Sequence, residues 1–124
     1  DEETIKPEDI VGKNVSFFTR RADGENRFFN GYVNRFAYCG KGDRGHMYRA
    51  TVVPWLWFLT RTSDCRIFQN MTVPEIITEV FEKFGFTDFR LDLKGAFTKR
   101  EFCVQYSETA FNFVSSLMED CGIF

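Results

Sequence analysis

The sequence predicts an α+β protein, with an antiparallel half of β-hairpins that forms part of a small barrel, followed by a helix-strand-strand-helix module. Alternating and aromatic segments separated by turn signals occupy residues 14–60. Helical spacing with a helix start signal first occurs after residue 71. The change near Thr62 has no linker, so we expect two halves, residues 1–62 and residues 63–124, that pack against each other.

The first half is predicted to begin with a hairpin. Residues 14–20 alternate between two faces, and residues 27–38 form a longer aromatic strand after the Asp-Gly turn signal at residues 23–24. Gly31 has no side chain to pack, which predicts a bulge or a tight bend of the kind that closes a small barrel.

A glycine-rich loop at residues 39–45 leads to a third predicted strand at residues 47–53. Its glycines lie near Lys41 and Arg44, which raises the alternative of a phosphate-binding loop. The spacing does not match that motif and no helix follows, so we expect an exposed hairpin loop.

Residues 55–60 are predicted to form a strand after Pro54, because alternate side chains are apolar on both of its faces. Such a strand is buried on both sides, by the chain itself or by a neighbouring subunit. We therefore expect a core or a subunit interface at Trp55, Trp57 and Phe58. An aromatic ligand platform is the alternative, but a sugar- or base-stacking surface normally interleaves aromatic and polar residues.

A short one-faced helix is predicted over residues 73–84. Thr72 stands three residues before Glu75, so hydroxyl and carboxylate can each satisfy one free backbone donor of the other residue. Pro74 suits the first turn, and Gly85 can supply the left-handed residue that ends the helix. Apolar side chains on one stripe face the core. These are Ile76, Ile77, Val80, Phe81 and Phe84.

Two more strands and a helix complete the predicted second half. Residues 88–94 alternate cleanly, and residues 101–106 do the same. The first of these strands directs inward Phe89, Leu91 and Leu93, and the second has on one face Phe102, Val104 and Tyr106. Ser107 is predicted to cap the second helix with Glu108 at its positive end, and Gly122 ends it. Its buried stripe is Val114, Leu117, Met118 and Cys121, flanked by Phe111 and Phe113.

The composition favours assembly with other chains. The 44% apolar content supports a core, but 16 phenylalanines and an 18% aromatic share are difficult for 124 residues to bury. Net charge is −2 with both signs interspersed, and without a Lys/Arg block we expect no nucleic-acid partner. No apolar run approaches the roughly 20 residues of a bilayer span, so no stable membrane anchor is expected. The start without Met and the stop at residues 122–124, where a strand would be expected to follow, indicate a fragment of a longer protein.

The sequence predicts no catalytic, cofactor or metal site. His46 is the only histidine, which leaves no convincing base for a serine or cysteine nucleophile. The four cysteines lack ligand spacing, and although three full disulfide pairings are open, reduced and mostly buried thiols are the preferred interpretation. Carboxylates fall in loops or on polar helix faces, which indicates solvated charge. In the polar segment at residues 64–69, Arg66 and Gln69 are predicted to hydrogen-bond between the halves or to reach another subunit.

Several segments occur in an order and at a spacing typical of one family. They include residues 29–36, Pro54-Trp-Leu-Trp-Phe-Leu59, residues 64–69, residues 73–77, residues 101–106, residues 111–117 and residues 121–123. Over nearly its whole length the chain resembles the VgrG proteins of bacterial type VI secretion systems, and more distantly the hub of contractile phage baseplates.

The resemblance implies a phage tail hub-like fold, in which barrel modules share the ring of a homotrimer and an α/β module lies on its periphery. It implies a structural, non-enzymatic component of the type VI secretion spike, which joins the Hcp inner tube to a membrane-puncturing spike tipped by a PAAR protein and helps deliver effectors. It also implies assembly in the bacterial cytoplasm, then secretion out of the cell or into a target cell. From the residues alone, an aromatic-rich peptide- or carbohydrate-binding β module stays open as an alternative, and a cell-wall hydrolase would need a carboxylate or Cys/His cluster.

Overall fold

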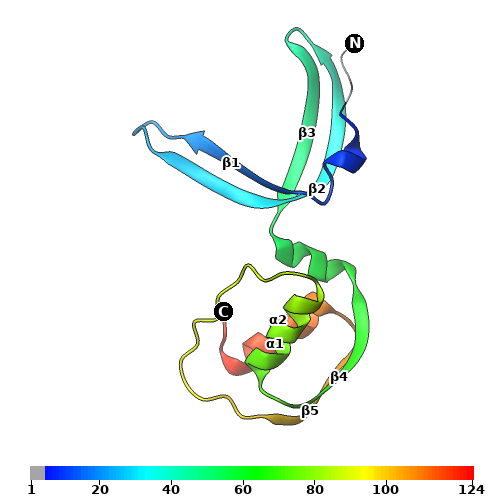
Figure 1. Cartoon of the computed structure of the whole chain (residues 1–124), viewed down its shortest axis with the longest axis vertical. Helices are drawn as coiled ribbons and strands as arrows, with labels where there is room; N and C mark the ends of the chain where they lie inside the picture. Colours follow the sequence, from blue (N-terminus) through cyan, green and yellow to red (C-terminus); the bar gives the residue numbers. More distant parts are fainter. Residues whose placement is uncertain (1–4) are drawn as a thin grey trace. The chain divides into compact units, whose positions relative to one another are not determined.

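The structure is a computed structural model that describes residues 5–124 (Figure 1). In chain order its elements are η1 (Pro7–Asp9), β1 (Asn14–Arg20), β2 (Asn26–Gly42), β3 (Gly45–Val53), η2 (Trp55–Arg61), β4 (Ser63–Met71), α1 (Val73–Lys83), β5 (Arg100–Thr109) and α2 (Ala110–Cys121). The predicted α+β class with antiparallel sheets is confirmed. The chain divides into unit 1, up to Trp55, and unit 2, from Leu56 onward. This division falls at the start of η2, and the predicted boundary after residue 62 lies just past its end.

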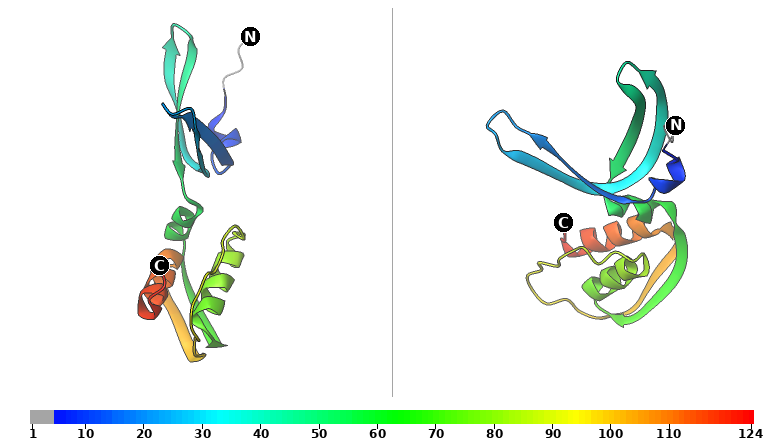
Figure 2. Two further views of the ribbon diagram at one scale, coloured as in Figure 1. Left: turned by 90° about the vertical axis from the view of Figure 1, so that its left-hand side faces the viewer. Right: turned by 45° about the horizontal axis from the view of Figure 1, so that its top comes forward.

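Unit 1 is an open three-stranded antiparallel sheet in the order β1-β2-β3. The predicted first hairpin is confirmed, with Phe17 opposite Phe29 and Phe18 opposite Phe28. Its turn uses Gly24 at φ +87°, where an L side chain would be strained. β2 bends between its pairing with β1 and its pairing with β3, so the two hairpins diverge within the unit (Figures 1 and 2).

Gly31 is required by close packing across the sheet. A β-carbon at this position would lie 2.6 Å from Val52 Cγ1 and 2.8 Å from the Val53 carbonyl oxygen, closer than real contacts allow. Of the bulge or tight bend predicted at Gly31, the register shifts lie elsewhere, between Val33 and Arg35 and between Tyr38 and Gly40. Gly31 itself lies beside Tyr32, where the pairing of β2 passes from β1 to β3 and the strand bends, and the missing side chain lets the backbones of β2 and β3 approach closely.

Unit 2 places α1 and α2 on one face of the antiparallel β4–β5 ribbon, which curves around the two helices (Figure 1). The predicted capping box of α1 is confirmed: the Thr72 backbone N–H donates to Glu75 Oε2 at 2.7 Å, and the Glu75 N–H donates to Thr72 Oγ1 at 3.4 Å. The rings of Phe68 on β4 and Phe113 on α2 stack with centroids 5.6 Å apart. Burial of each such side chain stabilises the fold by about 1.5–3 kcal/mol. The hydrophobic core of the unit consists of Leu59, Phe68, Val73, Ile76, Ile77, Val80, Phe81, Cys103, Ala110, Phe113, Val114 and Leu117.

The strand predicted for residues 55–60 is wrong, because this segment is the 3-10 helix η2. Pro54 supplies no ladder donor, and a short run that is apolar on every face does not distinguish a strand from a helix. The helical turn puts Leu59 in the core at 0% exposure and lets Thr60 Oγ1 donate to the Trp57 carbonyl at 2.6 Å.

The predicted strand at residues 88–94 is also wrong, and the segment predicted as a polar connection, residues 64–69, forms most of β4 instead. Residues 86–94 have no regular structure, although Phe89 packs edge-on against Phe81 with centroids 5.0 Å apart. Leu91, predicted to point inward, is 42% exposed. An alternating pattern forms a strand only where a partner edge is available, and β5 pairs with β4.

The second helix begins two residues later than predicted. Thr109 is its N-cap, and its Oγ1 accepts the Asn112 N–H at 3.2 Å. Ser107, the predicted cap, lies in β5 with φ +47°, and its N–H donates to Cys65 Sγ at 3.4 Å. The predicted end at Gly122 is confirmed by its φ of +65°. Phe113 is buried at 4% exposure, so the buried stripe of α2 is centred nearer its start than the sequence predicted.

Candidate interaction surface

Among the described residues, the side chains that could take part in catalysis do not converge. The Tyr38 hydroxyl lies 3.0 Å from His46 Nδ1 on an exposed hairpin. Within residues 5–124, no three His, Cys, Asp or Glu side chains are grouped so that they could hold a metal ion. None of the helices in this range combines the length and the apolar character of a membrane span.

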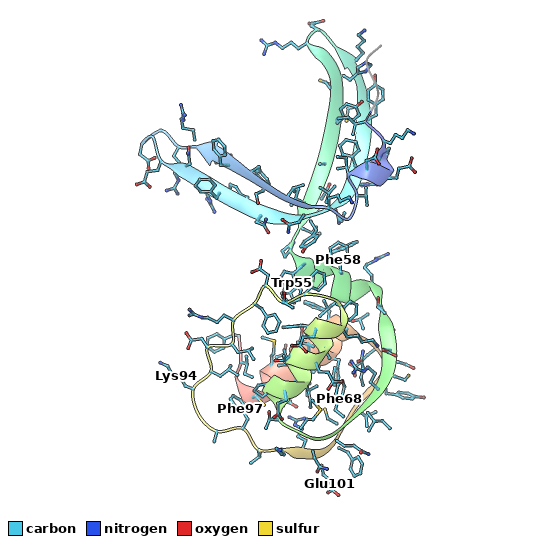
Figure 3. All side chains as sticks on the ribbon, in the orientation of Figure 1. Trp55, Phe58, Phe68, Lys94, Phe97 and Glu101 are labelled. Carbon is cyan, nitrogen blue, oxygen red and sulfur yellow. The ribbon has the colours of Figure 1, made fainter. Side chains whose placement is uncertain are left out.

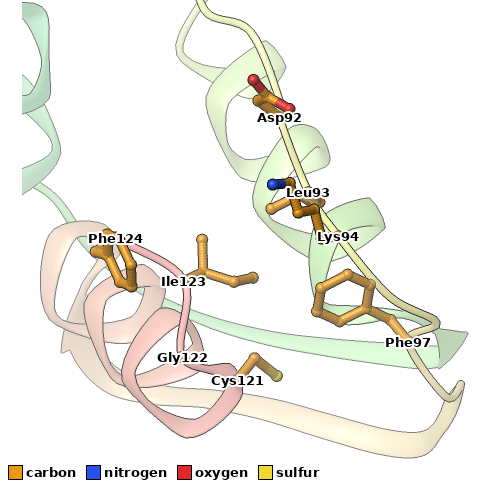
Figure 4. A pocket seen from close by; sticks show the side chains of 8 residues that line it. All are labelled: Asp92, Leu93, Lys94, Phe97, Cys121, Gly122, Ile123 and Phe124. Atoms are coloured by element: carbon orange, nitrogen blue, oxygen red, sulfur yellow. The ribbon is translucent and has the colours of Figure 1, made fainter.

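One pocket of unit 2 is an open hollow of about 410 Å³. Its lining consists of Asp92, Leu93, Lys94, Phe97, Cys121, Gly122, Ile123 and Phe124 (Figure 4). The irregular segment after α1 forms one side and the end of α2 the other. Asp92 is already hydrogen-bonded to Arg90 at 3.1 Å, and both side chains are mostly exposed. This pocket holds one carboxylate, one amine and one thiol in contact with solvent, which does not constitute a nucleophile with its base.

The three aromatic residues predicted at an interface lie together in η2, where Trp55 and Phe58 are labelled in Figure 3. Trp57 and Phe58 meet edge to face with centroids 5.3 Å apart, and Arg61 lies over the Trp57 ring at 5.3 Å. Phe58 also contacts Phe86, 6.1 Å away. All three predicted residues are half-buried, so each keeps ring surface accessible to a partner.

Arg66 points toward α1, where it forms an ion pair with Glu79 and lies 4.6 Å from the centre of the Phe68 ring. Beside it, Lys83 forms an ion pair with Asp64. The Lys83 hydrogen bond, followed by the Cys65 backbone N–H, holds the pKa of Asp64 below its usual range. These contacts join β4 to α1 inside unit 2.

Gln69 is exposed and lies opposite Phe102 in the β4–β5 ladder. The bridging role that the sequence predicts for Arg66 and Gln69, between the halves or to another subunit, stays a prediction.

The strands of unit 1 carry charge of one sign. They contain Arg20, Arg27, Arg35, Lys41 and Arg49, and no Asp or Glu. Carboxylates between residues 14 and 53 occur only in the two hairpin turns. We call β1, β2 and β3 together the cationic sheet. Sequence reasoning missed this feature because net charge was counted over the whole chain, whereas a count confined to the strands would have found it.

Aromatic side chains accompany these cations. Phe36 stacks on Tyr48 at 5.2 Å, Tyr48 contacts Tyr38 at 5.4 Å, and Tyr38 contacts His46 at 5.6 Å, so rings run along one face of the β2–β3 hairpin. Because Arg35 pairs with Thr51 and Ala37 pairs with Arg49, both arginines lie on the opposite face beside small side chains.

The β4–β5 ribbon exposes apolar side chains on the face turned away from the helices. Ile67 lies directly opposite Val104, and the alternation of β5 puts Phe102 and Tyr106 on the same side. Their exposed fractions are 66% for Ile67, 52% for Val104, 61% for Phe102 and 77% for Tyr106. We call these four residues the outer face. The sequence correctly predicted that the three β5 residues share a face, but β4 and Ile67 were missed.

The features of the described residues that could bind a partner are therefore two exposed surfaces, the cationic sheet and the outer face, and not a cleft. Exposed surfaces of this kind are typical of structural assembly proteins. The chain belongs to the phage tail baseplate hub (GPD) family, whose model matches residues 1–124. The resemblance to VgrG proteins expected from the sequence is confirmed by relatives of that name.

Type VI secretion system spike protein VgrG1a of Pseudomonas aeruginosa is 48% identical over 117 residues, which are 94% of this chain and 18% of that protein. VgrG1c of the same organism is 47% identical over 115 residues, 93% of this chain and 16% of that protein. The actin cross-linking toxin VgrG1 of Vibrio cholerae is 38% identical over 122 residues, 96% of this chain and 11% of that protein. The chain thus spans only a small part of the length of these relatives.

The fold is similar to that of the solved E. coli c3393 protein, a component of the type VI secretion system with structural similarity to the T4 bacteriophage tail proteins gp27 and gp5. The TM-score is 0.77 at 27% identity, and the match covers 93% of this chain and 32% of that chain. The family match and the structural similarity thus agree that the chain has the fold of the baseplate hub family.

Proposed function

We propose that the chain is part of a trimeric hub that joins the Hcp inner tube to the membrane-puncturing spike. The spike is tipped by a PAAR protein, and the hub helps deliver effectors. The observation that carries the proposal is the family match over residues 1–124, together with spike-protein relatives at 47–48% identity. The exposed outer face and the cationic sheet support it, since a hub must hold several neighbours at once. In this proposal the chain binds neighbouring proteins of the hub, catalyses no reaction and needs no cofactor. It assembles in the bacterial cytoplasm and then leaves the cell with the spike.

A chimera tests this proposal. Residues 1–124 replace the matching segment of P. aeruginosa VgrG1a, and the chimera is expressed in cells that lack the native protein. We expect a particle of trimer mass by light scattering and release of Hcp into the medium, as with native VgrG1a. A chimera that folds by circular dichroism but stays monomeric, or that releases no Hcp, would refute the proposed function.

We further propose that Trp55, Trp57 and Phe58 hold this chain against a neighbouring subunit. In the chimera, Trp57→Ala should lower the trimer fraction, because an accessible aromatic anchor and the stacked Arg61 are lost from the contact. Leu91→Ala, at a 42% exposed side chain of the irregular segment, is the control and should leave the trimer intact. An unchanged trimer mass in the folded Trp57 variant would show that η2 serves only its own unit.

A peptide- or carbohydrate-binding β module is the second candidate. The ring series from Phe36 to His46 favours it, since sugars stack on exposed aromatic faces. It predicts a monomer whose intrinsic fluorescence changes on titration with chitin oligosaccharides or apolar peptides. A trimeric chimera without such a response excludes this candidate.

A further inference from the structure

The cations of unit 1 lack acidic partners. The strands of the cationic sheet contain five Lys/Arg and no carboxylate. Within residues 5–124, none of these five side chains forms an ion pair with a carboxylate. In unit 2, by contrast, Arg66, Lys83, Arg90 and Arg100 each pair with one. The sheet therefore presents positive charge that its own strands do not neutralise, and charge complementarity selects an anionic partner for it.

Two of these cations stand close together on one face of the β2–β3 hairpin. Arg35 pairs with Thr51, and Arg49 pairs with Ala37, so each guanidinium group has a small side chain as its cross-strand neighbour. All four side chains are exposed. On this face, only the small Thr51 stands between Arg35 and the outer edge of β3. Both arginines can therefore reach a group that lies beside this edge.

β3 is an edge strand of unit 1 (Figure 1). Its inner side pairs with β2, and within residues 5–124 no strand pairs with its outer side. Backbone N–H and C=O groups along such an edge are a template on which an extended peptide can add as a further strand. An added strand would place one side chain opposite Arg49 and another, two positions away, opposite Thr51 and within reach of Arg35. Only a polypeptide can pair with the backbone groups and the arginines together.

We propose that the outer edge of β3 binds an extended acidic segment of another polypeptide, which adds to the sheet as a fourth strand. Carboxylates at alternate positions of the segment pair with Arg49 and Arg35, because the planar guanidinium fork matches the two oxygens of a carboxylate. The side chains between them lie on the opposite face, beside Ala50 and Tyr48, where apolar groups fit. This binding goes beyond the proposed hub function and does not depend on it.

The test measures binding of labelled synthetic peptides to the 124-residue chain by fluorescence anisotropy. The probe alternates glutamate with valine over nine residues, the length of β3. We expect binding at about 50 mM NaCl that weakens at about 500 mM, because the screening length shortens several-fold. A peptide with lysine in place of glutamate should not bind. A glutamate peptide methylated on the amides that face β3 should bind at least about tenfold more weakly, since it cannot donate to the edge.

Charge exchange assigns the contact to the two arginines. Arg35→Glu with Arg49→Glu should raise the dissociation constant of the glutamate peptide by at least about tenfold, and this variant should bind the lysine peptide instead. Lys6→Glu with Lys13→Glu changes the charge of unit 1 by the same amount outside the strands and should leave the affinity unchanged. Far-ultraviolet circular dichroism checks that each variant is folded, which is expected because every substituted side chain is exposed.

Each outcome decides for or against the acidic strand. A preference for the glutamate peptide that the arginine variant reverses supports it. A wild-type chain that does not bind this peptide, a methylated peptide that binds as tightly, or an arginine variant that binds like wild type would overturn it. Tighter binding to a single-stranded DNA or to phosphatidylserine vesicles than to the peptide would also overturn it, because the cations would then serve another class of partner. The hub function is measured separately, by Hcp release from the chimera, so the two proposals fail separately.

Discussion

Gln105 is the buried polar side chain on which the junction between β5 and α2 depends. It is 1% exposed, and its Nε2 donates to the Glu108 carbonyl at 3.0 Å. The intervening Ser107 adopts φ +47°, a conformation that non-glycine residues rarely hold without support. The amide thus supports a strained irregularity near the end of β5, where the register against β4 shifts between Asp64 and Arg66.

Gln105→Leu should therefore lower the free energy of unfolding by about 1–3 kcal/mol, because the Glu108 carbonyl loses its donor at a part-buried site. Urea denaturation followed by circular dichroism measures the change. Gln69→Leu is the matched control on the partner strand, where the side chain is exposed, and it should shift stability by less than about 0.5 kcal/mol. Equal effects of the two substitutions would contradict the assigned role.

Glu75 gives the fold a stability that depends on pH. The Thr72 backbone N–H, and then its hydroxyl, hold the pKa of Glu75 below the ordinary value of 4.5. Its stabilisation is therefore fully present above the unfolded-state pKa and is lost as the pH falls through the lower folded-state pKa. The stability difference between wild type and Glu75→Gln should shrink as the pH falls through this window, measured by urea denaturation at stepped pH. Glu82→Gln, on the exposed side of the same helix, is the control, and a pH-independent gap for Glu75→Gln would refute the assignment.

At the scale of elements, the sheet of unit 1 depends on how closely β2 and β3 approach. Gly31→Ala should destabilise the chain by about 1–3 kcal/mol, because the added methyl would meet Val52 and the rigid Val53 carbonyl. Gly42→Ala is the control, since its nearest neighbour is the flexible Met47 side chain at 3.4 Å. Thermal denaturation of both variants tests this, and an unperturbed Gly31 variant would mean that β3 can move away without cost.

Elements with local signals were predictable, and those formed by distant pairing were not. The Thr72–Glu75 box fixed the start of α1, and the Asp-Gly turn fixed the first hairpin, since each signal lies within a few residues of its effect. β4 was missed because its partner β5 lies beyond α1 and the irregular segment that follows it. Among candidate site residues, the sequence correctly placed Phe102, Val104 and Tyr106 on one face of β5. It could not show that this face is exposed, because that depends on which face of the β4–β5 ribbon α1 and α2 cover.

At the scale of the whole molecule, the two units differ in how they are stabilised. Val33 is the only hydrophobic core side chain within residues 5–55, and the rest of the core lies in unit 2. A three-stranded sheet with little burial opens more readily than strands and helices around a shared core.

Native-state hydrogen exchange should therefore show amides of the cationic sheet opening at a lower free energy than those of α1, α2 and the β4–β5 ribbon. Exchange is measured at a low protein concentration. If the amides of both units exchanged with the same opening free energy, the prediction that unit 1 is the less stable unit would be wrong.

The outer strands β1 and β3 have a consequence for chains that have not yet been assembled. A bare strand edge is a template on which another copy can add, and repeated addition leads to fibres. Arg20 on β1 and Arg49 on β3 give both edges the same sign of charge. Like charges on the edges of two copies should therefore disfavour the edge-to-edge addition of one copy to another.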